Sequence, residues 1–158
     1  MNIGIIVHSQ TGNTLSVAQK LEEKLRAEGH AVTLEHLQTV GEVKPGAKDI
    51  RFQALPNIGE YDALVFGAPV QAFSLAPVMK SYLAQVTAVQ GKRVAFLLTQ
   101  HFPYPWMGGN RAMKQFRNST GLRGAVMCGT GIINWSRAGR EQQVKEVVAT
   151  MSRQLCAN

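Results

Sequence analysis

Residues 8–14 read His-Ser-Gln-Thr-Gly-Asn-Thr, with hydroxyl and amide side chains around one glycine and no Lys, Arg, Asp or Glu. They follow the largely apolar run 3–7, which is typical of a strand, and precede a helical pattern of apolar residues. The first turn of a helix leaves backbone N–H groups without partners, and the helix dipole favours negative charge there. Capping needs one hydroxyl, whereas this segment offers three, on Ser9, Thr11 and Thr14. The segment therefore predicts a site for a phosphate monoester.

Strand-like and helix-like segments alternate along the chain around this loop. Strands are predicted over residues 2–7, 31–37, 63–66, 93–98 and 125–128, and helices over 17–25, 75–83, 110–118 and 144–155. Three of the strands are continuous apolar runs, which indicates burial on both faces and hence a parallel sheet. Glycine and proline residues interrupt 39–60, so a loop or a short turn is expected there in place of a helix. The alternation predicts a three-layer α/β sandwich.

Length and composition narrow the class of protein. The 158 residues, 45% of them hydrophobic, fit one globular domain, 1–158. The longest mostly apolar stretch, 63–73, is too short to cross a bilayer, so no membrane insertion is expected. The N-terminus has no basic segment before its apolar one, which argues against a signal peptide and favours a cytoplasmic location. Cys128 and Cys156 are too few and too far apart in the sequence for a metal motif or a disulfide framework, so no metal site is predicted.

The charge of the chain is unevenly distributed. The formal net charge is +7, yet the 78 consecutive residues 63–140 contain no Asp or Glu and nine Lys or Arg. A positive net charge is typical of proteins that bind nucleic acid. The sequence contains no recognised nucleic-acid-binding module, however, so we do not expect nucleic acid as a partner. Whatever site residues 63–140 build has no carboxylate from this stretch.

The first loop resembles the S/T-x-T-G-x-T phosphate loop of the flavodoxin family, and YDALVFGAP at 61–69 resembles the third strand and flavin loop of that family. The resemblance implies that FMN is the cofactor and that hydroxyls and main-chain N–H groups, without Lys or Arg, bind its 5′-phosphate. The residues so assigned are Ser9, Gln10, Thr11, Gly12, Asn13 and Thr14. It also implies a three-layer flavodoxin-like sandwich with a five-stranded parallel sheet of order 2-1-3-4-5.

Two further loops follow strands whose carboxyl ends meet the first loop. In the loop 67–74, the resemblance implies that backbone groups of Pro69, Val70, Gln71 and Ala72 bond the pyrimidine edge of the flavin. Phe73 either lies against the flavin ring or packs under the next helix.

The loop 99–109 concentrates three of the eleven aromatic residues of the chain within five positions. The cofactor-binding candidates here are Thr99, Gln100, His101, Phe102, Tyr104, Trp106, Gly108 and Gly109. The aromatic rings are flat apolar partners for a planar cofactor, and the alternative is a rim that packs on another subunit of a homo-oligomer. The two glycines let the chain approach a ligand closely.

Histidines near these loops have two interpretations. His101 is a candidate for a catalytic proton donor, and the alternative is a side chain that only hydrogen-bonds a neighbouring loop. His8 is expected to have a structural role. No other catalytic residue is identified from the sequence.

Two functions remain open from the sequence. Flavodoxins proper are acidic carriers with a glycine beside the ring, whereas both ring loops here are acid-free and positions 70–73 lack glycine. Positive potential and a stiff loop favour two-electron chemistry, so we expect an FMN-dependent oxidoreductase linked to NAD(P)H or quinone. The alternative is a non-catalytic electron carrier that docks an acidic redox partner protein. Arg111, Lys114 and Arg117 are the nearest docking candidates, or else form a solvated helix face.

Overall fold

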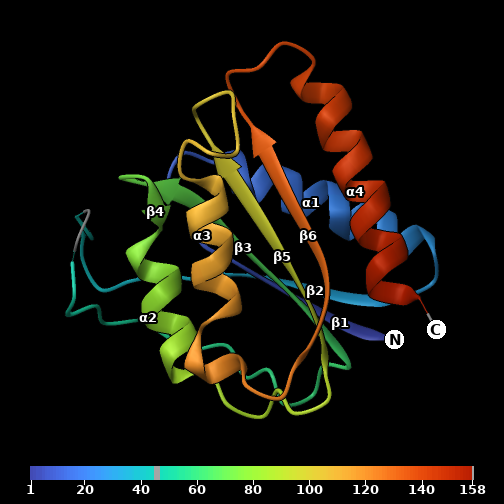
Figure 1. Ribbon diagram of the computed structural model, residues 1–158. Helices are drawn as coiled ribbons and strands as arrows, with labels where there is room; N and C mark the ends of the chain where they lie inside the picture. The colour runs from blue at the N-terminus through green and yellow to red at the C-terminus, as the bar shows by residue number, and fades with distance from the viewer. Residues whose placement is uncertain (45–46, 158) are drawn as a thin grey trace.

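The computed structural model describes residues 1–44 and 47–157. Strands and helices alternate along the chain, with the helices on both sides of one central sheet (Figure 1). The strands are β1 (Asn2–Val7), β2 (Ala31–His36), β3 (Ala63–Gln71), β4 (Ser74–Leu75), β5 (Arg93–Gln100) and β6 (Val126–Asn134). The helices are α1 (Asn13–Ala27), α2 (Pro77–Gln85), α3 (Gly109–Arg117) and α4 (Arg140–Cys156), with a 3-10 turn at Thr120–Leu122. None of these helices is long and apolar enough to cross a membrane.

Five parallel strands form the central sheet in the order β2-β1-β3-β5-β6. This confirms the predicted order 2-1-3-4-5, because β4 is a two-residue strand that pairs antiparallel with the end of β3, off the main path. Ile3 of β1 lies opposite Val32 of β2 on one side and Ala63 of β3 on the other. Because the five strands run in one direction, the loops that follow them gather at one edge of the sheet.

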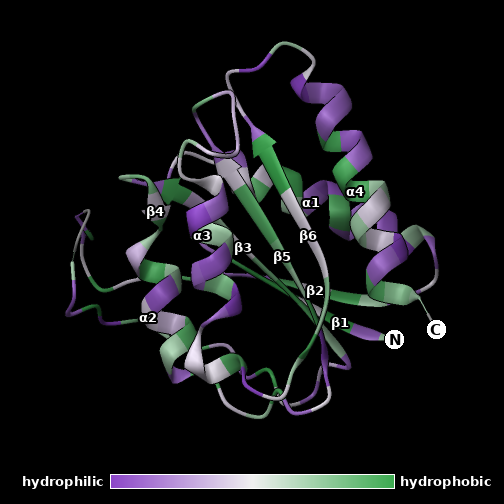
Figure 2. Cartoon of the chain, viewed as in Figure 1, coloured by the Kyte–Doolittle hydropathy of each residue, from purple (hydrophilic) through white to green (hydrophobic). Residues whose placement is uncertain are grey.

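Alternate residues of the central strands pack against two helical layers. Ile6, Phe66 and Phe96 belong to a core shared with α2 and α3, whereas Ile5 and Val65 belong to a core shared with α1 and α4. Figure 2 shows the resulting hydrophobic colour along the central strands. Burial on both faces is the physical reason why these strands appear in the sequence as continuous apolar runs.

Helix α1 carries the first loop at its N-terminus and is anchored by one apolar face. Val17, Leu21 and Leu25 are at most 1% exposed, at the three-to-four-residue spacing of a helix. Gly29, with φ of +93°, follows the helix end in the left-handed conformation that commonly terminates helices. The loop before α1 is thus attached to a helix that the core holds firmly.

Strand β3 is longer than predicted, running to Gln71 rather than ending at residue 66. Proline within a strand normally removes a ladder hydrogen bond. The pairing of β3 with β1 ends at Gly67, however, so Pro69 pairs only with Thr99 of β5. A backbone N–H at position 69 is therefore not needed on the side of β1. The predicted flavin loop therefore begins inside the strand.

Strand β6 also extends beyond its predicted end at residue 128 and runs to Asn134. Its glycines serve close packing. A Cβ at Gly131 would lie 2.4 Å from Val147 of α4, so glycine lets α4 lie directly on the edge strand. The carboxyl end of β6 brings a fourth loop, from residue 135, to the edge where the predicted site lies.

Among the described residues of 37–62 there is no helix, only an isolated bridge between Thr39 and Phe52. Val43, Ile50 and Phe52 pack against the core under α2. An irregular segment that contributes apolar side chains replaces a helix, as the glycines and prolines predict.

Candidate functional site

The loop between β1 and α1 is fixed by Ser9. The Ser9 hydroxyl accepts hydrogen bonds from the N–H of Gly12 at 3.1 Å and of Leu15 at 3.2 Å. Its backbone N and O both lie 3.2 Å from Nε2 of His36, at the end of β2. A hydroxyl oxygen that accepts two bonds keeps its own proton, so the Ser9 O–H is still a donor for a ligand. No signal in the sequence identified His36 as the residue that holds this loop.

Several donors of the same loop have no partner in the protein. The N–H groups of Gln10, Thr11, Asn13 and Thr14 find no acceptor within residues 1–44 and 47–157. The side chains of Thr11, which is exposed, and Asn13, which is half-buried, make no hydrogen bond within those ranges either. N–H groups at the start of a helix, with hydroxyl and amide groups beside them, suit an anion.

Thr14 has a different role from the other hydroxyls of the loop. Its side chain is 1% exposed, and its Oγ1 lies 2.7 Å from Oγ1 of Thr99, which is 3% exposed. This bond ties the first turn of α1 to the end of β5. Thr14 and Thr99 were both predicted to bind the cofactor, and the structure places their hydroxyls against each other beneath the loops.

The second predicted loop is a tight hairpin. Strands β3 and β4 pair Gln71 with Ser74, which leaves Ala72 and Phe73 as a two-residue turn with φ of 50° and 59°. Positive φ at both positions is typical of the turn that joins twisted strands, where Asn-Gly is usual, and costs a residue with a Cβ about 1–2 kcal/mol. Gln115 of α3 holds the hairpin by accepting the N–H of Leu75 at 2.7 Å.

The third predicted loop lies against this hairpin. A Cβ at Gly108, whose φ is +114°, would lie 3.0 Å from Cα of Phe73 and 2.9 Å from Val70. Gly108 and Gly109 are both buried, so they allow contact between protein segments rather than facing solvent. A Cβ at Gly109 would meet Oε1 of Gln100 at 2.6 Å.

Aromatic side chains from these two loops form two exposed pairs. Phe73 and Phe102 stack with ring centroids 5.3 Å apart and planes within 5°, and Tyr104 and Trp106 stack at 5.8 Å and 6°. The four rings are between 40% and 72% exposed. Phe73 is therefore not a core residue under the next helix, which was one of its two interpretations.

Gln100 is buried and holds the aromatic loop from below. It is 3% exposed, and its Nε2 contacts the carbonyl oxygens of Phe102 and Tyr104 and, at 2.6 Å, Oδ1 of Asn134. The N–H of Asn134 is in turn bonded to the side chain of Gln143 in α4. Gln100 was predicted to bind the cofactor, and the structure makes it a support of the loop. Asn134 was missed because β6 was predicted to end six residues earlier.

The three loops form the wall of one cavity of about 220 Å³ at the carboxyl edge of the sheet. Its lining residues are Gln10, Thr11, Asn13, Pro69, Val70, Gln71, Thr99, Gln100 and His101. All nine belong to the predicted site, and none is a carboxylate, Lys or Arg. The Gln71 amide donates to Oε1 of Gln10 across the cavity. Ten of the predicted site residues do not line it: Ser9, Gly12, Thr14, Ala72, Gly108, Gly109 and the four stacked aromatics.

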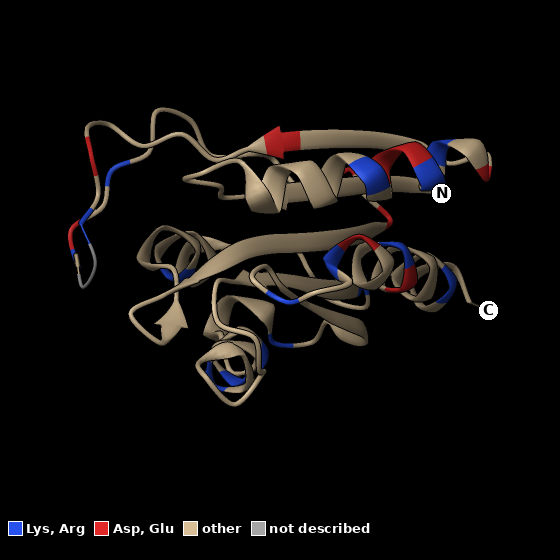
Figure 3. Cartoon of the chain, turned by 90° about the horizontal axis from the view of Figure 1, so that it is seen from above, with Lys and Arg blue, Asp and Glu red and all other residues tan. Residues whose placement is uncertain are grey.

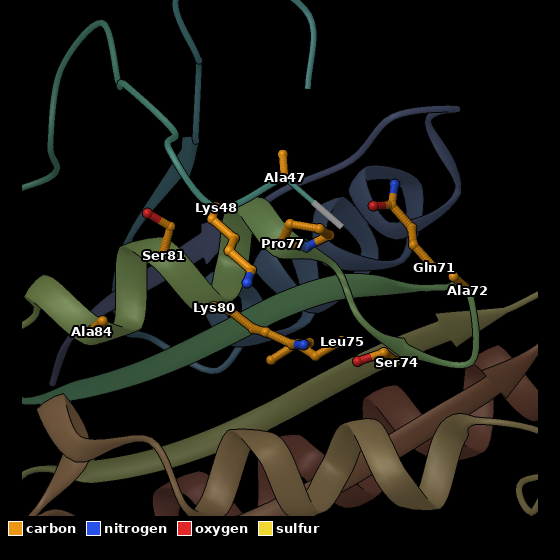
Figure 4. Close-up of a pocket in the computed structure, with 10 residues that line it drawn as sticks. All are labelled: Ala47, Lys48, Gln71, Ala72, Ser74, Leu75, Pro77, Lys80, Ser81 and Ala84. Carbon is orange, nitrogen blue, oxygen red and sulfur yellow. The ribbon is translucent and has the colours of Figure 1, made fainter. Parts of the chain in front are cut away.

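Two larger cavities nearby are basic. A cavity of about 610 Å³ lies between the β3–β4 hairpin, α2 and residues 47–48, and Lys48 and Lys80 are its charged residues (Figure 4). A second, of about 620 Å³, lies along α3 and β6 and includes Arg111, Lys114 and Arg117. Figure 3 shows acidic residues on α1, α4 and the 37–62 segment, whereas α2 and α3 have none.

His8 lies beside the first loop without adding charge to it. Burial, together with the nearby charge of His36, lowers the pKa of His8 from 6.5 to about 4. His8 is therefore neutral near pH 7, and its structural role stays a prediction. Binding of an anion at this loop relies on hydrogen-bond donors and the helix dipole, not on a cationic histidine at position 8.

Comparison with known proteins bears on this arrangement. A sequence model described as NADPH-dependent FMN reductase matches residues 1–139. The chain belongs to this family. No curated protein matches it in sequence.

Solved structures of low sequence identity share the fold of this FMN reductase family member. A flavodoxin of Streptococcus pneumoniae TIGR4 is 19% identical, with 99% of each chain covered and a TM-score of 0.72. Oxidised flavodoxin 2 from Bacillus cereus is 18% identical, with 97% and 99% covered and a TM-score of 0.68. A flavoprotein from Lactobacillus acidophilus NCFM, solved in complex with FMN, is 17% identical, with 92% and 97% covered and a TM-score of 0.58.

Family and fold make this chain an FMN-binding, flavodoxin-like oxidoreductase, and the family implies NAD(P)H as substrate. The donors of the first loop fit the phosphate of FMN. The four N–H groups that find no acceptor among residues 1–44 and 47–157, together with the Ser9 O–H, supply what a phosphate dianion needs.

Proposed function

We propose that this chain uses FMN to transfer electrons in pairs from NAD(P)H to a small acceptor such as a quinone. The observation that supports this is the meeting of three predicted loops around one cavity that has no carboxylate. When bound, FMN accepts a hydride and passes the electrons on. The protein binds and orients the reactants, and the lack of negative charge favours an anionic reduced flavin.

The phosphate of FMN is assigned to the loop before α1. The O–H of Ser9, the side chains of Thr11 and Asn13, and the N–H groups of the first helical turn are the donors. Thr14 contributes its N–H, because its hydroxyl is shared with Thr99. This arrangement supports phosphate binding without Lys or Arg.

The ring of FMN is assigned to the side of the cavity where the hairpin and the aromatic loop meet. Phe73 and Phe102 present parallel faces from the two loops, and parallel stacking suits a third planar ring. Val70 and Gln71 line the cavity, and their backbone groups are assigned to a polar edge of the ring. His101 lines the same cavity and remains the candidate for a proton donor.

The phosphates of NAD(P)H are assigned to the cavity that contains Lys48 and Lys80. Gln71 lines both this cavity and the smaller one, so a nucleotide whose phosphates contact the lysines can extend toward the flavin loops (Figure 4). The basic cavity of α3 shares no lining residue with the smaller one. The α3 cavity instead favours the second candidate function, which is docking of an acidic redox protein.

The exposed Tyr104–Trp106 pair is the candidate contact for a second subunit.

Anaerobic mixing of FMN-loaded protein with NADPH, and then with a quinone, tests two-electron transfer. We expect NADPH to bleach the flavin absorbance and the quinone to restore it over many turnovers, with little one-electron-reduced flavin on photoreduction. Stable accumulation of the one-electron form without NADPH turnover would overturn the proposal in favour of a carrier.

A pair of double variants tests the assignment of the nucleotide phosphates. Loss of Lys48 and Lys80 (both →Ala) is expected to raise KM for NADPH at least tenfold with kcat retained, because each lysine–phosphate contact contributes about 1.5–3 kcal/mol. The matched change of Lys114 and Arg117 to Ala should leave KM within twofold. The reverse result would place the phosphates at α3.

A further inference from the structure

Glu28, His30 and Cys156 form a cluster at the opposite end of the sheet from the cofactor loops. Glu28 follows the end of α1, His30 precedes β2, and Cys156 is the last residue of α4. One ligand atom of each lies within 4.8 Å of the others, and Sγ of Cys156 is 3.3 Å from Nε2 of His30. Figure 1 shows this end of α4 beside the start of the chain. The three residues were not connected by sequence, because they are separated by up to 128 positions.

Neighbouring groups orient two of these side chains from behind. Nδ1 of His30 is 3.1 Å from the α-amino group of Met1, which leaves Nε2 facing the cluster. Oε2 of Glu28 accepts a hydrogen bond from Ser152, which is 1% exposed, and Oε1 pairs with exposed Lys24 at 2.9 Å. A metal-bound histidine usually donates its far ring N–H to an acceptor, so His30 fits this pattern when the α-amino group of Met1 is neutral and accepts from Nδ1. A hydrogen bond on a ligating carboxylate is usual as well.

We propose that this cluster binds Zn²⁺. Cysteine sulfur, histidine nitrogen and glutamate oxygen are the ligand types that Zn²⁺ takes, whereas Mg²⁺ and Ca²⁺ prefer oxygen alone. In a tetrahedral site, bonds of about 2.3 Å to sulfur and 2.0 Å to nitrogen place the two ligand atoms roughly 3.5 Å apart. The contact between His30 and Cys156 already has nearly that length, at 3.3 Å.

Binding requires small changes at the cluster. The metal displaces two protons to solvent, the thiol proton of Cys156 and one proton of the Met1–His30 pair, so that Nδ1–H of His30 then donates to the neutral α-amino group of Met1. Glu28 gives up its weak surface pair with Lys24. Three protein ligands leave a fourth position for water. No oxidation or reduction is involved.

The bound metal would join the end of α4 to the turn between α1 and β2. The bonds from Ser152 to Glu28 and between Cys156 and His30 already connect these segments, which also pack on a common core. The site therefore stabilises the folded chain, because a ligand that binds only the native state shifts unfolding by mass action. It uses none of the residues assigned to FMN or NAD(P)H, so either proposal can fail without the other.

Cobalt titration of the chelator-treated full chain, with a free Met1 amine, tests the site. We expect one Co²⁺ per chain, with the absorption of a tetrahedral ion and a thiolate-to-cobalt band, both lost on addition of Zn²⁺. In parallel, Zn²⁺ should raise the midpoint of thermal unfolding.

Two serine variants make the test specific. Cys156→Ser should abolish the thiolate band and weaken Zn²⁺ binding at least tenfold. Cys128→Ser, the matched control on β6, should keep the thiolate band and the Zn²⁺ affinity of the unchanged chain. Glu28→Gln should weaken binding without removing the thiolate band, which separates loss of a ligand from loss of the fold. The proposal is overturned if Co²⁺ gives no thiolate band, or if Cys156→Ser binds Zn²⁺ as tightly as the unchanged chain.

Discussion

Changing Thr14 to Val removes one partner of the buried hydroxyl pair that joins the phosphate loop to β5. The two oxygens are 2.7 Å apart and the side chains at most 3% exposed, so Thr99 would keep a buried hydroxyl with no partner from Thr14. An unsatisfied buried hydroxyl costs about 1–3 kcal/mol, and Val has nearly the shape of Thr, so little cavity cost is added. The free energy of unfolding should fall by that amount, which lowers Tm by about 2–12 °C for a chain of this size.

Urea unfolding of the flavin-free protein, followed by circular dichroism, measures this effect without a contribution from cofactor binding. The double variant Thr14→Val with Thr99→Val should recover most of the loss, because both polar groups are then absent. A Thr14→Val variant within 0.5 kcal/mol of the unchanged chain, or a double variant as unstable as the sum of the singles, would refute the reasoning.

Thr11→Val is the matched change within the same loop. Thr11 is exposed and its side chain has no hydrogen-bond partner among the described residues, so the free energy of unfolding should stay within about 0.5 kcal/mol. Its hydroxyl is assigned to the FMN phosphate, and a bond to a charged group contributes about 1.5–3 kcal/mol, so Kd for FMN should rise roughly 10- to 150-fold. Unchanged flavin affinity in a fluorescence titration would remove Thr11 from the site.

Three other perturbations have defined outcomes. Ala72→Gly should stabilise the hairpin by about 0.5–1 kcal/mol in urea unfolding, because glycine adopts positive φ without strain, and should raise the yield of one-electron-reduced flavin on photoreduction. Gly108→Ala should destabilise the fold by about 1–3 kcal/mol through its contact with Phe73, and an unchanged Tm would contradict the close approach. His8 has a folded pKa of about 4 against 6.5, so the unfolded chain takes up its proton first, and stability should fall as pH decreases from 6.5 to 4. His8→Asn should flatten that part of the urea-measured pH profile.

Local signals in the sequence were sufficient for the first loop and for the presence of five buried strands, but not for the ends of β3 and β6. The apolar runs predicted strands buried on both faces, and the hydroxyl-rich segment 9–14 predicted a helix start with free donors, because both depend on neighbouring residues. The β3–β4 hairpin had no such signal, since Ala72 and Phe73 are poor residues for positive φ. Contacts with residues distant in sequence compensate for this. Gly108 has no Cβ and so leaves room for Phe73 of the turn, and the side chain of Gln115 accepts a hydrogen bond from the N–H of Leu75 in β4.

Dependence on residues distant in sequence also explains why two predicted cofactor ligands that line the cavity support its loops from beneath. Gln100 and Thr99 lie at the carboxyl end of a strand, where sequence alone suggests contact with a ligand. Whether such a side chain faces the ligand or the core depends on partners distant in sequence, here Asn134 and Thr14. A glutamine and a threonine satisfy buried partners as readily as a cofactor, so residue type cannot distinguish the two roles.

The separation of charge between the two helical layers explains how a neutral loop can serve anionic reactants. The phosphate loop contributes dipoles and short hydrogen bonds, which act over a few ångströms and set affinity and orientation. Helices α2 and α3 carry Lys80, Arg111, Lys114 and Arg117 and no carboxylate, and their charges act over a longer range, up to a Debye length of about 8 Å at physiological salt. Short-range donors can therefore recognise the ester while α2 and α3 attract the nucleotide. A cation inside the loop would be redundant there, and its desolvation next to buried Thr14 would oppose binding.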